Sequence, residues 1–188
     1  MLTGQLDIDK SIRTEKLSIS RWRIDNVFEV LFYYLIALAW PFMAGLKIYS
    51  DLKFDIFHWT SLILLVITLA LSLVLLYTIL NLYRLTRITG LSRGKNLGLI
   101  KQIVTDKNWN LVYSNHQMAR IDFPKHRSGF DWGQEIIILF DDRDILVNCM
   151  SFGLHNSPSP FHWYSNRLKV KAFKKAFDEK KNVLQQHL

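Results

Sequence analysis

The chain has 188 residues, including 24 Lys or Arg and 16 Asp or Glu, and its formal net charge at pH 7 is +8. A mean hydropathy of +0.08 excludes a protein that lies wholly inside a membrane, and the length favours one small domain beside a membrane module. The single cysteine excludes a disulfide framework and a metal site built from several cysteines.

Residues 1–26 are polar and mix five basic with four acidic side chains. We expect no cleaved secretory signal here, because the polar stretch is long and no small-residue cleavage site follows the first apolar run. The sequence predicts a cytosolic N-terminal tail that lies at the membrane surface.

Two apolar runs follow, and together they predict a transmembrane hairpin over residues 27–83. The run Ile56–Tyr83 contains no formal charge, and ~20 apolar residues suffice for a helix to span a bilayer. The shorter run Val30–Leu46 contains Pro41, which kinks a helix but is tolerated in a span when a neighbouring helix satisfies the freed carbonyl. An interfacial helix is the alternative for this shorter run.

The flanking charges predict the orientation of this hairpin. Five basic residues precede the first run, and Arg84, Arg87, Arg93 and Lys95 follow the second. The connecting loop has only Lys47 and Lys53, which acidic residues offset. Because basic residues concentrate on the cytoplasmic side, we expect a multi-pass protein of the inner (cell) membrane with both termini cytoplasmic.

The second run carries Ser61, Thr68 and Ser72 on one helical face. Small hydroxyl residues of this kind favour close helix packing. The alternative is a polar path through an oligomer, and such a channel would need several copies because two helices cannot enclose a pore.

Residues 84–95 form a predicted basic juxtamembrane linker. The glycines and lysine of Gly90–Lys95 resemble a phosphate-binding loop, but the spacing is one residue short and Asn96 replaces the Ser or Thr. We therefore interpret the segment as a hinge that contacts anionic lipid.

Residues 96–188 predict a cytosolic α+β domain in which a four-stranded antiparallel sheet lies between two helices. Asn96 is a candidate cap for a helix that ends near Asp106. The predicted strands are 109–113, 119–123, 135–140 and 145–152, and a helix starts near Trp163. The acidic residues 141–144 between the last two strands favour a hairpin turn over a metal site.

Two loops are longer than hairpins require, and such loops often carry function. The segments 124–133 and 153–162 offer basic, aromatic, amide and imidazole side chains, and the second leads into a helix N-terminus, which attracts anions. Arg167 is suited to a phosphate contact, and Trp132 and Trp163 to base stacking. The alternative is two ordinary exposed loops. The predicted ligand-binding residues are Lys125, His126, Arg127, Trp132, His155, Asn156, Trp163 and Arg167.

No catalytic residue, metal ligand or cofactor is predicted. The sequence contains no H-E-x-x-H, C-x-x-C or G-x-S-x-G motif. Cys149 lies in an apolar run and is expected to be a core residue. We therefore do not expect an enzyme.

The order of basic tail, two spans and basic α+β domain resembles small two-span membrane effectors of prokaryotic antiviral systems, especially the CRISPR-associated kind that responds to cyclic oligoadenylate. The resemblance covers the whole chain as a layout, and no motif matches residue by residue. It implies a domain that binds a cyclic oligonucleotide messenger, a homo-oligomer that perturbs the bilayer in antiviral defence, and no binding of duplex nucleic acid. The alternative is a membrane-anchored scaffold whose basic domain docks a protein partner or anionic lipid.

Overall fold

The computed structural model describes residues 6–19, 24–54, 56, 58–123, 133–153 and 158–186. The chain divides into two compact units. One contains residues 22–81, and the other combines residues up to 21 with residues 82–188. The second unit is therefore discontinuous in sequence, with the first inserted into it.

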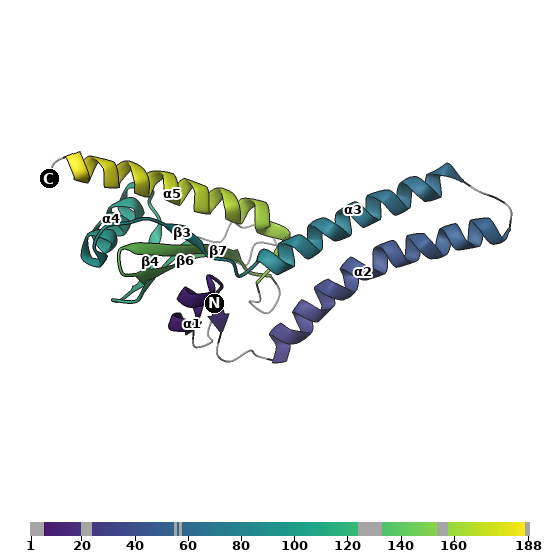
Figure 1. Ribbon diagram of the computed structural model, residues 1–188, viewed down its shortest axis with the longest axis horizontal. Helices are drawn as coiled ribbons and strands as arrows, with labels where there is room; N and C mark the ends of the chain where they lie inside the picture. Colours follow the sequence, from purple (N-terminus) through teal and green to yellow (C-terminus); the bar gives the residue numbers. More distant parts are fainter. Residues whose placement is uncertain are drawn as a thin grey trace. The chain divides into compact units, whose positions relative to one another are not determined.

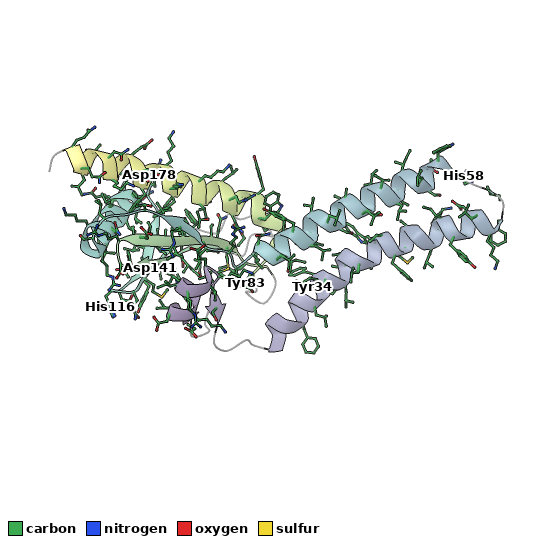
Figure 2. The ribbon with its side chains drawn as sticks, in the orientation of Figure 1. Tyr34, His58, Tyr83, His116, Asp141 and Asp178 are labelled. Carbon is green, nitrogen blue, oxygen red and sulfur yellow. The ribbon has the colours of Figure 1, made fainter. Side chains whose placement is uncertain are left out.

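The inserted unit is a pair of long apolar helices, α2 (Ile24–Lys53) and α3 (Trp59–Asn81). Both are long and apolar enough to cross a membrane, as the sequence predicts. Helix α2 continues past the apolar run that predicted it and contains Pro41. The connection therefore shortens to residues 54–58, and Figure 2 shows His58 at this end of the hairpin.

Small side chains lie in the contact between α2 and α3. Ala37 and Ala44 of α2 are buried, and so are Ser61 and Ser72 of α3. The hydroxyl of Ser61 donates a hydrogen bond to the buried carboxylate of Asp51 on α2. Such residues let two backbones approach closely, which agrees with the predicted packing role for Ser61 and Ser72. Thr68, the third residue of that face, is half-buried and donates to carbonyls of its own helix.

The outward surfaces of both helices are apolar. Only 17% of the residues in the most apolar part of each helix are buried within the protein. Figure 2 shows the side chains projecting outward along both helices. Soluble monomers rarely expose an apolar surface of this extent.

The other unit is built on one antiparallel sheet in the strand order β3-β7-β6-β5-β4. The strands are β3 (Thr86–Ile88), β4 (Asn110–Ser114), β5 (Met118–Phe123), β6 (Gln134–Asp141) and β7 (Asp144–Ser151). The sheet therefore has five strands rather than the predicted four. The additional strand, β3, was missed because three residues are too short for an alternating pattern.

Two helices cover one face of this sheet, α4 (Arg93–Asp106) and α5 (Trp163–Gln186), as Figure 1 shows. Alternate residues of β6, such as Ile136 and Ile138, pack with Phe173 and Phe177 of α5 in one buried cluster. Cys149 belongs to the same cluster, and burial raises the pKa of its thiol. Its predicted role as a core residue is confirmed.

The start of α4 differs from the prediction. The N-cap is Ser92, and Asn96 lies within the first turns of the helix. Asn96 is fully buried. Its Oδ1 accepts a hydrogen bond from the backbone N–H of Leu91, and its Nδ2 donates to the carbonyls of Leu91 and of Arg143 in the β6–β7 turn. Asn96 therefore joins the helix to the sheet and does not cap it.

The N-terminal segment covers part of the opposite face of the sheet. It contains β1 (Leu6–Asp7), α1 (Ile8–Thr14) and β2 (Ser18–Ile19), with β1 and β2 paired antiparallel. Its apolar side chains pack on a second buried cluster that includes Ile137, Leu139 and Leu146. The described part of the predicted tail is thus a folded layer of the sheet domain.

Candidate functional site

Both long loops begin at the same end of the sheet. Phe123 at the end of β5 pairs with Gln134 at the start of β6, and Gln134 pairs with Ser151 at the end of β7. The backbone N–H of Phe152 donates to the carbonyl of Gly133 at 3.0 Å. The anchor points of the two loops are therefore neighbours, although the loops are far apart in sequence.

The first turn of α5 is fixed to this end by the buried side chain of Asn166. Its Oδ1 accepts hydrogen bonds from Gln134 Nε2 at 2.6 Å and from Ser151 Oγ at 2.8 Å. A short 3-10 helix, η2 (Pro160–His162), leads directly into α5. The N-terminus of α5 thus lies beside the bases of both loops.

Two of the predicted ligand-binding residues are described, and both lie in this region. Trp163 is the first residue of α5, and the guanidinium carbon of Arg167, one turn later, lies 5.7 Å from the centroid of its ring. Arg167 is exposed and Trp163 is half-buried. The six others lie outside the described residues: Lys125, His126, Arg127, Trp132, His155 and Asn156.

An ionisable cluster that the sequence analysis did not identify lies at the same end, on the face opposite α4 and α5. Asp122 and Glu135 are direct partners in the β5–β6 register, and Arg120 Nε lies 3.6 Å from Asp122 Oδ1 and 3.9 Å from Glu135 Oε2. Among the described residues these three atoms are buried and make no hydrogen bond. Burial raises the pKa of Glu135, and the like charge of Asp122 adds to the rise, while Arg120 opposes it.

The only sequence signal for this cluster is a carboxylate at the start of an otherwise apolar strand. Residues Gln134–Asp141 read QEIIILFD, so Glu135 precedes a run of large apolar residues. Arg120 and Asp122 alternate with Ala119 and Ile121, which places both on one face of β5. Only the strand register brings that face of β5 to Glu135.

The segment that follows α3 is held firmly to the same domain. Asn148 of β7 donates from Nδ2 to the carbonyl oxygens of Leu82, at 3.2 Å, and Arg84, at 2.7 Å. Because β3 runs antiparallel to β7, residues 82–85 extend from β3 toward the end of the sheet at which β7 finishes. The chain therefore leaves α3 and enters the domain on the side that carries the loop bases.

The segment that precedes α2 is bonded to this same stretch. Leu17 N donates to the carbonyl of Tyr83, and Leu85 N donates to the carbonyl of Glu15, each at 2.8 Å. Arg87 also pairs with Glu15, with 2.9 Å between Nε and Oε1. Both ends of the helical hairpin thus connect to segments that hydrogen bond to each other.

The acidic turn between β6 and β7 is structural. Arg87 Nη1 contacts Asp141 Oδ2 at 2.7 Å and Asp144 Oδ2 at 3.1 Å, which reduces the repulsion between the two carboxylates that face each other across the turn. The predicted hairpin turn is confirmed. In the part of the chain that the structure describes, no group of three or more His, Cys, Asp or Glu could hold a metal ion.

Comparison with known proteins gives no relative. No protein-family model matches the chain, and no curated protein or solved structure matches it significantly.

Proposed function

We propose that this chain is a membrane-anchored effector in which the sheet domain binds an anionic ligand and passes the binding event to the helical hairpin. The ligand that fits the resemblance in layout is a cyclic oligonucleotide messenger, and the response is perturbation of the membrane in antiviral defence. One observation carries the proposal. The bases of both long loops, the start of α5 and the segment leaving α3 converge at one end of the sheet.

The exposed apolar surface of α2 and α3 supports insertion of the hairpin into a bilayer. Burial of apolar surface is worth ~25 cal/mol per Å², so exposure of these helices to water would be very unfavourable. The bonds between residues 15–17 and 83–85 support a hairpin whose two ends lie on one side of the membrane. The excess of Lys and Arg outside the hairpin favours the cytoplasmic side.

The charge of the domain supports an anionic ligand. Residues 84–188 contain seventeen basic and nine acidic side chains, which accounts for the whole net charge of +8. Arg167 presents an exposed guanidinium beside an aromatic ring, a pairing that suits a phosphate next to a base. The loop residues 125–127 would add further cationic groups, and the response requires a homo-oligomer because two helices cannot enclose a pore.

The proposal requires that the ligand prefer one of two arrangements of the hairpin. A ligand shifts such an equilibrium only by its difference in affinity for the two states. Residues 82–85 connect the loop end of the sheet to the hairpin. They hydrogen bond to β7, which ends at the loops, and to the segment that precedes α2.

A thermal-shift screen of the full chain in detergent tests the binding step. We expect one cyclic oligonucleotide to raise the unfolding temperature while its linear form and mononucleotides do not. At ~100 times its dissociation constant a ligand stabilises by ~2.7 kcal/mol. Arg167→Ala should abolish the shift, and Lys101→Ala, which removes an exposed charge on α4, should preserve it. Absence of a shift with every nucleotide would refute ligand binding.

The basic surface of α5 favours a second candidate function, a scaffold that docks a protein or anionic lipid. Helix α5 contains seven basic and two acidic residues. Such docking would weaken steeply with salt and show no preference among nucleotides. A pull-down that recovers one partner in stoichiometric amount would support this function over the first.

A further inference from the structure

The outward face of α5 combines apolar and basic side chains in a regular pattern. Tyr164, Leu168, Lys171 and Lys175 are spaced by four, three and four residues and therefore share one face of the helix. The core residues Phe173 and Phe177 lie on the opposite face. This outward stripe lies on the opposite side of the sheet from Arg120, Asp122 and Glu135.

The apolar members of the stripe are large and well exposed. Tyr164 is 64% exposed and Leu168 is 47% exposed, and Phe161, just before the helix, is 61% exposed. Lys171, Lys174 and Lys175 are exposed in the following turns. A helix that presents aromatic and apolar residues beside lysines is typical of a surface that lies in the headgroup region of a bilayer.

The position of this face in the domain points to the same partner. Leu82, the first residue after α3, is bonded to Asn148, and the start of α5 is bonded to Ser151 on the same strand. Three residues of a strand span ~10 Å. If α3 ends at the membrane surface, the apolar end of α5 therefore lies within reach of the headgroups.

We infer that the outward face of α5 binds the anionic headgroups of the leaflet in which the hairpin is anchored. Tyr164 and Leu168 enter the interface, and Lys171 and Lys175 contact phosphates. The attraction is electrostatic and apolar together, so it requires anionic lipid and weakens with salt. The inference depends on the hairpin crossing the membrane and is independent of any nucleotide ligand.

Site-specific labels on the full chain in vesicles test this inference. In a Cys149→Ser background, Leu168→Cys and Val183→Cys each carry a polarity-sensitive fluorophore. Val183 lies on α5 four turns further on and is 55% exposed, so it is a matched control. In phosphatidylcholine vesicles that contain phosphatidylglycerol, we expect the label at 168 to be shielded from aqueous iodide and quenched by a headgroup-labelled lipid. The label at 183 should stay accessible to iodide.

Charge variants complete the test. The double variant Lys171→Glu with Lys175→Glu should expose the label at 168 to iodide. Binding of the α5 face to anionic lipid should weaken roughly fivefold or more for each lysine replaced. Lys101→Glu with Lys107→Glu makes the same charge change at exposed positions of α4 and its C-cap and should have no effect. Equal shielding in pure phosphatidylcholine, or equal effects of the two variant pairs, would overturn the inference.

A label at Leu73 of α3, which is 65% exposed in the structure, separates the two ways of failing. Shielding at 73 with full iodide access at 168 means that the hairpin is inserted and the α5 inference is wrong. Iodide access at both positions means that the hairpin itself is not inserted, which overturns the inference together with the membrane anchoring on which it depends.

Discussion

Asn148→Ala should loosen the connection between the hairpin and the sheet. The side chain is 5% exposed and donates to two backbone carbonyls, those of Leu82 and Arg84. Each hydrogen bond contributes about 1 kcal/mol net, and a carbonyl left buried without a partner adds to the cost, so we expect a loss of about 2 to 3 kcal/mol. For a domain of this size such a loss lowers the unfolding temperature by roughly 10 °C.

The assay combines thermal unfolding of the full chain in detergent with amide hydrogen exchange. Exchange should accelerate at Leu85 and Leu17, whose amides bond the segments on either side of the hairpin. Asn182→Ala is the control, because Asn182 is exposed on α5. A fall in unfolding temperature no larger than that of the control, with unchanged exchange at Leu85, would show that Asn148 does not hold this junction.

Three further predictions follow from local geometry. Gly90→Ala should destabilise the domain by about 1 to 3 kcal/mol in chemical denaturation, because the added Cβ would lie 2.5 Å from a backbone carbonyl oxygen. Gly98→Ala is the control: it lies on α4 with open space around it and should stabilise the domain by about 0.5 to 1 kcal/mol. Burial raises the pKa of Glu135 in the folded state, so its contribution to stability is present below pH 4.5 and is lost as pH rises through the raised pKa. The unfolding temperature of Glu135→Gln, compared with that of the wild type, should therefore increase over that pH range. Ser61→Ala should weaken the hairpin by roughly 0.6 kcal/mol in a steric-trapping assay, because it removes one bond to Asp51.

Each of these has a clear contrary result. Equal effects of the two glycine substitutions would mean that the close contact at position 90 does not resist a methyl group. A parallel pH dependence of wild type and Glu135→Gln would mean that Glu135 does not titrate abnormally. A loss above about 2 kcal/mol for Ser61→Ala would exceed the largest measured bonds of this kind and would indicate a wider rearrangement of the hairpin.

Much of the fold could be predicted because it depends on patterns that are local in sequence. The long apolar runs predicted α2 and α3, alternation predicted β4 and β5, and two short apolar runs predicted β6 and β7. Strand β3 has only three residues, and it forms because β7 offers a free edge at Val147. The residues of β3 alone do not indicate that β7, which is distant in sequence, pairs with them.

The N-terminal layer and the Arg120 cluster were missed for a related reason. Ile8 and Ile12 lie among charged residues, so the segment has the composition of a tail, yet they pack on a cluster formed by residues 137–150. Arg120 and Glu135 meet through strand register alone. For the candidate site, the sequence supplied the residue types, and the convergence of the loop bases with the start of α5 required the structure.

Release of a dye from vesicles that contain the full chain is the most direct test of the proposed effector function. We expect the one cyclic oligonucleotide that stabilises the protein to release the dye, its linear form to have no effect, and Arg167→Ala to abolish the response while Lys101→Ala retains it. Stabilisation by that ligand without any release, in vesicles where the hairpin is inserted, would contradict the coupling of ligand binding to the membrane and leave the chain as an anchored binding protein.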